Sequence, residues 1–246
     1  MNYHIVIPAR MASERLPGKP LARIGTSTLL ERVWLRARDA AAASVVIATD
    51  SDEVLAVARA FGADALLTSD RHPSGSDRIA ECADLKGWGD GELIVNLQGD
   101  EPLMPPACLD QVASLLAAHP DADVASLYDT FADEMAAGDP NAVKVVTDRD
   151  GRALYFSRSR IPYRRGATDA VTWRRHIGLY AYRAGALRAF TRTPPTPLEK
   201  AEKLEQLRFL ESGRVIVMAQ AAEPIPAGVD TPEDLDRVRR LLTAAD

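Results

Sequence analysis

The chain has 246 residues, of which 46% are hydrophobic, and a formal net charge of −5 at pH 7. This length suits one large domain or two small ones, and the acidic balance argues against a protein that wraps nucleic acid. No apolar run approaches the roughly 20 residues of a membrane helix, and the first residues lack the pattern of a signal peptide. Cys82 and Cys108 have no metal-binding or redox spacing, which favours small buried residues in a reducing compartment. We therefore expect a cytoplasmic protein with no membrane insertion.

Strand and helix patterns alternate along residues 1–130. Short β-branched apolar runs predict buried strands, and apolar residues at helical spacing predict the helices between them. The predicted strands are 4–8, 44–49, 65–68, 93–98 and 124–128. The predicted helices are one capped by Ser27, then 52–61, one from about Asp77, and 105–118. Repeated βαβ units imply a mostly parallel sheet with right-handed crossovers.

The pattern changes after about residue 138. Two strand-like runs, 142–147 and 153–156, flank the turn sequence D-R-D-G and predict a hairpin. The next segment, 157–175, is rich in Arg and Gly and has no periodicity, as functional loops often do. The remaining predicted elements are a strand, two helices, a strand and a C-terminal helix with Thr231 as its N-cap, at 177–182, 184–191, 198–211, 215–218 and from 231.

A basic segment, 9–21, follows the first predicted strand and reads A-R-M-A-S-E-R-L-P-G-K-P-L. Open α/β sheets bind ligands at the carboxyl ends of their strands. The segment and its flank bring four cations to that edge: Arg10, Arg15, Lys19 and Arg23. The segment differs from a P-loop, which needs G-x-x-x-x-G-K-[ST]. We predict that it binds a polyanion, most simply a triphosphate; a solvated basic loop is the alternative.

A second motif, V-N-L-Q-G-D-E-P at 95–102, places Asp100 and Glu101 at the same edge of the sheet. Carboxylate oxygens beside a phosphate site are typical Mg²⁺ ligands. Gly99 permits a close approach of the backbone, which favours a site over a turn with surface carboxylates. Near the C-terminus Asp230 precedes a helix that Thr231 already caps. Its carboxylate either stabilises the helix dipole or is a second Mg²⁺ ligand.

Several further motifs allow two interpretations. H-P-S-G-S-D-R at 72–78 is either a polar wall for a base or ribose, or a loop in which Ser76 or Asp77 caps a helix; A-T-D-S at 48–51 is equally open. A lone histidine such as His176 is more often a core or surface residue than a ligand. Glu205 and Gln206 could lie on the polar face of a helix whose apolar stripe is Leu204, Leu207 and Leu210.

Taken together, the motifs resemble the 3-deoxy-manno-octulosonate cytidylyltransferases of Gram-negative bacteria. The resemblance runs in order through nearly the whole chain, and its first motif is shared more loosely with sialic-acid cytidylyltransferases. The motifs are I-P-A-R-M-A-S-E-R-L-P-G-K-P-L, A-T-D-S, S-G-S-D-R, V-N-L-Q-G-D-E-P, P-N-A-V-K-V-V, A-L-Y-F-S-R-S-R-I-P, R-H-I-G-L-Y, L-E-K-A-E-K-L-E-Q-L-R and G-V-D-T-P-E-D-L.

The resemblance implies a Rossmann-like α/β nucleotidyltransferase fold, with a mostly parallel sheet and a smaller mixed β/α part for dimerisation and sugar binding. One domain, 1–246, would comprise a nucleotide-binding part (1–130), a sugar-acid-binding and dimerisation part (140–226) and a closing segment with the C-terminal helix (227–246). A homodimer is implied, with the subunit contact near 155–165.

The implied reaction transfers CMP from CTP to the anomeric hydroxyl of 3-deoxy-D-manno-octulosonate (Kdo), giving CMP-Kdo and pyrophosphate for lipopolysaccharide synthesis. A related 2-keto sugar acid, 8-amino-Kdo or sialic acid, is the alternative acceptor. The implied catalytic residues are Arg10, Lys19, Asp100 and Asp230, the last two as Mg²⁺ ligands. The implied CTP-binding residues are Arg10, Arg15, Lys19, Ser74, Gly75, Arg78 and Gln98. The implied Kdo-binding residues are Arg164, His176, Tyr180, Glu205 and Gln206.

Overall fold

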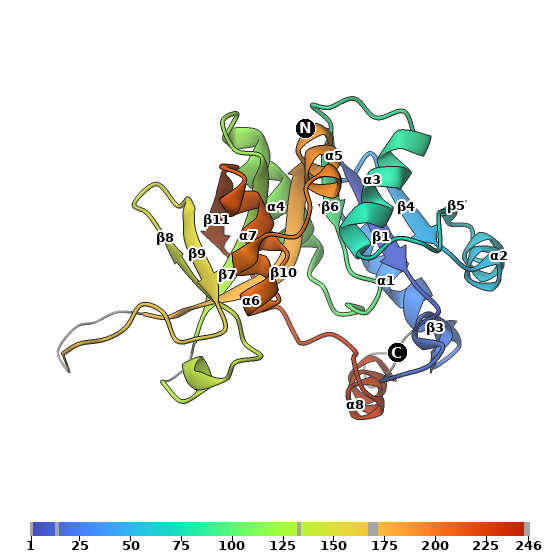
Figure 1. The fold of residues 1–246 in the computed structure, drawn as a ribbon. Coiled ribbons are helices and arrows are strands. Elements are labelled where there is room, and N and C mark those ends of the chain that lie inside the picture. The colour runs from blue at the N-terminus through green and yellow to red at the C-terminus, as the bar shows by residue number, and fades with distance from the viewer. Residues whose placement is uncertain (1, 13–14, 132–133, 167–171, 244–246) are drawn as a thin grey trace.

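A nine-stranded sheet forms the centre of the computed structural model, which describes residues 2–12, 15–131, 134–166 and 172–243 (Figure 1). Its strands are β1 (His4–Ala9), β4 (Ser44–Thr49), β5 (Asp64–Leu67), β6 (Leu93–Asn96), β7 (Val124–Thr130), β8 (Lys144–Thr147), β9 (Ala153–Ser157), β10 (Arg174–Arg183) and β11 (Ile216–Gln220). The main path runs β11, β7, β10, β6, β1, β4, β5, and β8 and β9 branch from β10. Two short strands, β2 (Arg23–Ile24) and β3 (Ser27–Thr28), form a separate ribbon.

Most of the main path is parallel, as the sequence predicts. β1 pairs in parallel with β4 and β6, β4 with β5, and β7 with β11. The exception is β10, which lies antiparallel between β6 and β7, with a register shift between Ile177 and Tyr180. The predicted hairpin of β8 and β9 is confirmed as an antiparallel pair. Thus β10, from the second half of the chain, lies in the middle of the sheet, next to β6 from the first half.

Helices cover both faces of this sheet. They are α1 (Leu29–Arg38), α2 (Asp52–Ala60), α3 (Gly75–Leu85), α4 (Pro106–Ala118), α5 (Ala184–Arg192), α6 (Pro197–Glu202), α7 (Gln206–Glu211) and α8 (Pro232–Thr243), with 3-10 turns η1 (Lys19–Leu21) and η2 (Ala136–Gly138). No helix among the described residues is long and apolar enough to cross a membrane.

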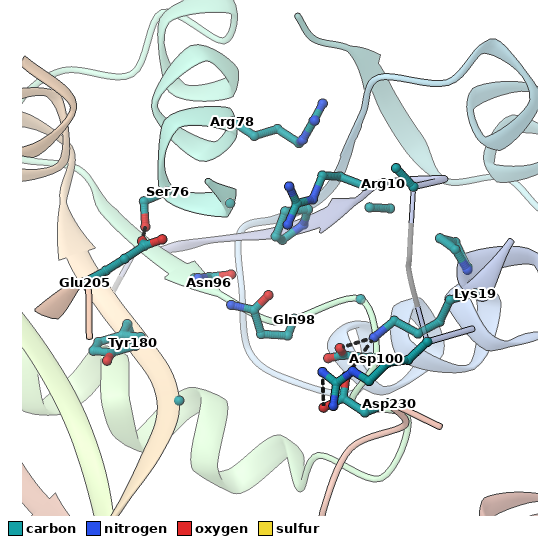
Figure 2. Close-up of a pocket in the computed structure, with 18 of the residues that line it drawn as sticks. Arg10, Lys19, Ser76, Arg78, Asn96, Gln98, Asp100, Tyr180, Glu205 and Asp230 are labelled. Carbon is teal, nitrogen blue, oxygen red and sulfur yellow. Dashed lines mark hydrogen bonds and ion pairs between the residues drawn. The ribbon is translucent and has the colours of Figure 1, made fainter. Parts of the chain in front are cut away.

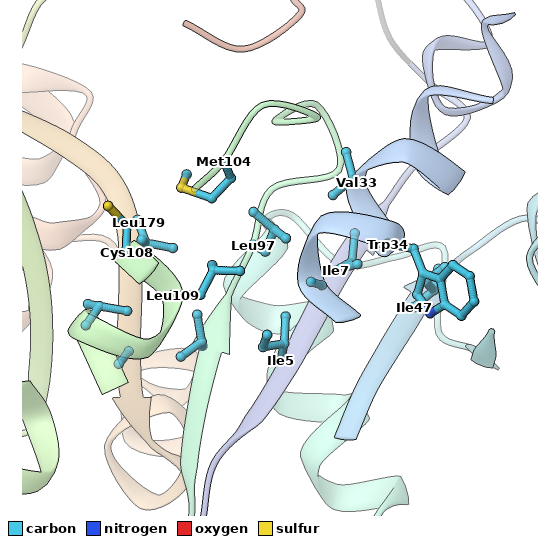
Figure 3. Close-up of a cluster of buried hydrophobic side chains, with 14 of the residues drawn as sticks. Ile5, Ile7, Val33, Trp34, Ile47, Leu97, Met104, Cys108, Leu109 and Leu179 are labelled. Carbon is cyan, nitrogen blue, oxygen red and sulfur yellow. The ribbon is translucent and has the colours of Figure 1, made fainter. Parts of the chain in front are cut away.

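The alternation of side chains along β1 separates two hydrophobic cores. Ile5 and Ile7 belong to the core with α1 and α4, whereas Val6 points to the opposite face, toward α3 and α5. Figure 3 shows the first core, with Ile5 and Ile7 on β1 and Val33 and Trp34 on α1. Each such fully buried aliphatic side chain contributes about 1.5–3 kcal/mol of transfer free energy. The sheet is therefore packed on both of its faces.

Two helix starts differ from the sequence-based prediction. Thr28, and not Ser27, caps α1, because Glu31 stands three residues after Thr28 and completes a reciprocal capping box. Similarly α3 starts at Gly75, two residues earlier than predicted, because Ser74 Oγ accepts the Asp77 amide at 3.3 Å. The predicted cap of α8 is confirmed, with Thr231 Oγ1 accepting the Asp234 amide at 3.2 Å.

The single helix predicted over 198–211 is wrong. Lys203 has φ of 55° and ends α6, and α7 begins three residues later at Gln206. A residue in the left-handed region cannot continue an α-helix, so the chain changes direction at this point. The break removes Glu205 and Gln206 from a continuous polar helix face.

Candidate active site

A cavity of about 980 Å³ opens at the carboxyl ends of β1 and β6. Figure 2 shows two groups of side chains at opposite ends of it, with Gln98 between them. At one end lie Lys19, Asp100 and Asp230, and at the other lie Tyr180 and Glu205. The segments that line it are far apart in the sequence, and the sheet edge brings them together as expected for an open α/β fold.

Lys19 lies at the centre of the charged end. Its Nζ is 2.6 Å from Asp100 Oδ2 and 3.2 Å from Asp230 Oδ1, and it donates to the carbonyl of Val229 at 3.1 Å. Arg15 Nη2 is 3.2 Å from the other oxygen of Asp230. The two carboxylates therefore converge on a single ammonium group.

The turn that presents Lys19 follows from its local sequence. Gly18 has φ of 66°, a left-handed value that favours glycine, and the Lys19 amide donates to the carbonyl of Leu16 at 3.1 Å. Pro20 is buried in the following 3-10 turn. This rigid turn holds the lysine on the cavity wall.

Close backbone contacts bring the two carboxylates together. A Cβ on Gly99 would lie 2.9 Å from the Pro8 carbonyl oxygen, so glycine lets the segment after β6 pass this near to β1. The amide of Val229 donates to the Asp100 carbonyl at 2.8 Å, which joins the segment before α8 to the segment after β6. The Asp230 carboxylate faces Lys19 and Arg15, and the helix is capped by Thr231 instead.

Glu101 has a different environment from Asp100. Its Oε2 is buried and has no hydrogen-bond partner among the described residues. Burial, with a smaller effect from the neighbouring Asp100, raises the pKa of Glu101 to about 8. Of the two adjacent carboxylates, only Asp100 lines the cavity.

The residues predicted to bind CTP differ in how they meet the cavity. Arg10, Gly75 and Gln98 line the cavity, as do Arg15 and Lys19. Ser74 instead caps α3 and lines a second cavity of about 440 Å³, which also borders Glu205. Arg78 borders the main cavity, but its side chain is fully buried.

Three of the five residues predicted to bind Kdo line the cavity. Tyr180, Glu205 and Gln206 line the cavity, and Ser76 Oγ donates to Glu205 Oε2 at 3.3 Å. Burial raises the pKa of both Glu205 and Tyr180. Glu205 and Gln206 line the cavity just after the chain breaks at Lys203, whereas Tyr180 comes from β10.

His176 and Arg164 are not among the residues that line the cavity. The His176 ring lies behind Tyr180, with centroids 5.3 Å apart, and its Nε2 is 3.1 Å from Ser126 Oγ. Burial lowers the pKa of His176 to about 3, so the imidazole is neutral at pH 7. The guanidinium of Arg164 stacks on Trp173 at 4.3 Å.

Asn96 is a cavity residue that the sequence analysis missed. It stands two positions before Gln98, and residues at that spacing share one face of a strand. Two carboxamides at alternate positions of an otherwise apolar run are a signal that could have identified it.

The carboxylates of Asp100 and Asp230 are the candidate Mg²⁺ ligands of the cavity. Within the described ranges no group of three or more His, Cys, Asp or Glu side chains has metal-binding geometry. Asp100 and Asp230 nevertheless converge on one cation, Lys19. Mg²⁺ is commonly held by one or two carboxylates together with substrate phosphates, so this pair suits a metal that arrives with a nucleotide.

Comparison with known proteins agrees with the geometry. A model of the cytidylyltransferase family matches residues 4–216. A protein of Pseudomonas syringae pv. tomato named 3-deoxy-manno-octulosonate cytidylyltransferase is 51% identical, over 98% of both chains. Another of that name, from Saccharophagus degradans, is 45% identical over 100% of both.

Solved structures of cytidylyltransferases are also similar to this chain. A structure of CMP:2-keto-3-deoxy-manno-octonic acid synthetase complexed with CTP superposes with a TM-score of 0.91 at 38% identity, covering 100% of this chain and 99% of that one. A cytidylyltransferase from Leptospira borgpetersenii shares the fold, with a TM-score of 0.64 at 17% identity over 99% of this chain and 87% of that one. The predicted Rossmann-like nucleotidyltransferase fold is therefore confirmed.

Proposed function

Because the chain belongs to the cytidylyltransferase family, we propose that it transfers CMP from CTP to the anomeric hydroxyl of Kdo. The main observation in support is that Lys19, Asp100 and Asp230 converge at one end of a cavity, while the other end offers polar groups. A triphosphate suits the first end, and a hydroxylated acid suits the second. The names of the relatives support Kdo as that acid.

In the proposed reaction the 2-hydroxyl oxygen of Kdo bonds to the α-phosphorus of CTP. The bond from that phosphorus to the oxygen shared with the β-phosphate breaks, pyrophosphate leaves, and the hydroxyl proton is released to solvent. Such displacements need mainly positioning and charge stabilisation from the protein. Arg10 and Arg15 would contact phosphate oxygens through planar guanidinium groups, and Lys19 would neutralise the departing pyrophosphate.

We also propose that Asp100 and Asp230 hold Mg²⁺ when the nucleotide binds. Their oxygens are hard ligands and converge from two segments on one point. When bound, the metal would stabilise charge on the phosphates and ease loss of the hydroxyl proton. Lys19 would then pair with the phosphates, since the two carboxylates that it contacts besides the Val229 carbonyl would face the metal.

The remaining predicted contacts belong to the same proposal. Gly75 and Gln98 would surround cytosine and ribose, together with Ser74 and Arg78. Tyr180, Glu205 and Gln206 would contact Kdo, and the neutral His176 would support Tyr180 from behind. Arg164 would reach the sugar only after leaving Trp173.

The predicted division of the chain is retained as a proposal. Most lining residues at the charged end come from 1–130, and Tyr180, Glu205 and Gln206 come from 140–226. Asp230 comes from residues 227–246 and also lines the cavity, which supports the proposal that this closing segment is a third part of the site.

We propose a homodimer in the cytoplasm. Large apolar side chains are exposed on and near the branch of the sheet that contains β9, among them Leu154 (61%) and Tyr163 (83%). Such side chains favour a covered surface. Cys82 and Cys108 are both buried and free, as expected in a reducing compartment.

Pyrophosphate release tests the function directly. The protein is incubated with CTP, Mg²⁺ and either Kdo, 8-amino-Kdo or sialic acid, and EDTA provides the metal-free control. We expect pyrophosphate and CMP-Kdo in equal amounts with Kdo. Pyrophosphate release with one of the other acids and none with Kdo would show that the other acid is the acceptor. Unaltered turnover in EDTA would show that the reaction does not need the metal.

A further inference from the structure

A buried ion pair lies directly behind the nucleotide half of the cavity. Arg78 Nη2 donates to Asp50 Oδ2 and Nη1 donates to Thr68 Oγ1, both at 2.5 Å. The Arg78 side chain is 0% exposed and that of Asp50 is 16% exposed. A buried charge without its partner is strongly unfavourable, so Asp50 is what allows the guanidinium to stay inside.

The three residues come from three different elements. Asp50 follows β4, Thr68 follows β5, and Arg78 stands in the first turns of α3. Thr68 is itself fixed, because its hydroxyl donates to the Thr49 carbonyl at 3.0 Å. The ion pair therefore ties the start of α3 to the carboxyl ends of two strands.

The start of α3 is also part of the cavity wall. Gly75 and Ser76 line the cavity, and Ser76 donates to Glu205. A Cβ on Gly75 would lie 3.7 Å from Pro8 Cγ, so this turn packs closely on the end of β1. A shift of α3 would change the width of the nucleotide half of the cavity.

One of the three guanidinium nitrogens of Arg78 has no partner among the described residues. Its Nε is buried and has no hydrogen-bond partner in the described part of the chain. Asp50 and Thr68 occupy the two terminal nitrogens, and the unsatisfied N–H remains at a residue that borders the cavity. A ligand acceptor at this wall would recover the cost of that unpaired group.

We propose that Asp50 is a positioning residue for nucleotide binding, which acts by holding Arg78 and the first turn of α3 against the carboxyl ends of β1, β4 and β5. This assigns a role to the A-T-D-S segment, whose purpose spacing alone leaves open. The inference rests on the proposed function only in taking CTP as the nucleotide.

The chain offers a matched control on the same helix. Lys86, just beyond the last turn of α3, pairs with Asp64 at the start of β5, with 2.6 Å between Nζ and Oδ2. This pair also joins α3 to β5, but at the end remote from the cavity. Asp64→Asn therefore removes a second, more exposed link between this end of the helix and β5 without touching the nucleotide wall.

The test measures CTP binding by calorimetry without Kdo, and steady-state kinetics with both substrates. We expect Asp50→Asn to raise the Kd and the KM for CTP about 10- to 100-fold, because a small misplacement of a binding wall has effects of this size. The kcat at saturating CTP and the KM for Kdo should stay within about twofold of the unaltered protein. Asp64→Asn should leave CTP binding within about twofold, as for an exposed pair. Asp50→Glu, which keeps the charge, should recover part of the affinity.

Thermal denaturation establishes that each variant is folded. If Asp50→Asn does not fold, Thr68→Val decides, since it keeps the ion pair and removes the two hydrogen bonds of the Thr68 hydroxyl, from Arg78 and to the Thr49 carbonyl; we expect about a 3- to 10-fold weaker affinity for CTP. Unchanged CTP affinity in a folded variant, equal losses with Asp64→Asn, or a fall in kcat with the KM for CTP unaltered would overturn the proposal. Absence of CTP binding by the unaltered protein would overturn both this proposal and the proposed function. CTP binding without turnover of Kdo would overturn only the function.

Discussion

Replacement of Lys19 by methionine should change metal and nucleotide binding in opposite directions. The ammonium group of Lys19 lies where the Asp100 and Asp230 carboxylates converge, 2.6 and 3.2 Å from their oxygens. A divalent cation that binds these carboxylates must compete with it. Lys19→Met keeps most of the side-chain volume and removes the competing charge.

The magnitude follows from the exposure of the three side chains. Lys19 is 17% exposed, Asp100 28% and Asp230 49%, so solvent screens the second pair more than the first. Two partly exposed pairs of this kind contribute about 1–2 kcal/mol together. Their loss should tighten Mn²⁺ binding to the nucleotide-free protein about 5- to 30-fold. The same variant should bind CTP more weakly, because it has no ammonium group to pair with the phosphates.

Paramagnetic resonance of free Mn²⁺ measures the first effect and calorimetry with CTP measures the second. Lys86→Met serves as the control, because Lys86 also pairs with a carboxylate but lies away from the cavity. Unchanged or weaker Mn²⁺ binding by Lys19→Met would refute the reasoning. It would mean that Asp100 and Asp230 do not form one cation site.

Three other changes test separate parts of the structure. Gly99→Ala places a methyl group 2.9 Å from the Pro8 carbonyl oxygen, so we expect about 1–3 kcal/mol lower stability by urea denaturation and much slower turnover; wild-type values for both would contradict the close approach. The folded-state pKa of His176 is about 3, below the unfolded value of 6.5, so its contribution to stability is present above pH 6.5 and is lost as the pH falls toward 3. Unfolding free energies at pH 7.5 and 5 should reveal about 2 kcal/mol of this loss, and His176→Phe should show that much less pH dependence. Glu205→Gln should raise the KM for Kdo about tenfold through loss of a charge-assisted contact and leave the Kd for CTP unchanged; the reverse pattern would place Glu205 on the nucleotide side.

Local features of the site could be predicted because each depends on neighbouring residues. The apolar run of β1 predicts a strand, and a loop after a parallel strand must lie at the carboxyl edge of its sheet. Asp100 follows a second such strand, and Gly99 stands where a Cβ would lie 2.9 Å from the Pro8 carbonyl oxygen. The cap at Thr231 likewise follows from the four residues T-P-E-D.

Other predictions failed or stayed open for equally physical reasons. Periodicity continues through 198–211 and contains no signal for the left-handed conformation of Lys203, so one helix was predicted where there are two. Ser27 and Thr28 are both good caps, and only the reach of Glu31 distinguishes them. Local sequence also carries no information on which strand pairs with β10.

By itself the amino-acid sequence determined the identity of the charged groups and the edge of the sheet to which most of them belong, because strand direction and turn chemistry are local. Only the tertiary structure decided that Asp230 meets Lys19, 211 residues earlier, and that Asp50 neutralises Arg78. These contacts depend on packing between distant segments: the Val229 amide bound to Asp100 in the first case, and α3 lying across two strand ends in the second. Distance along the chain does not encode such packing, so the convergence of the site became visible only in the folded molecule.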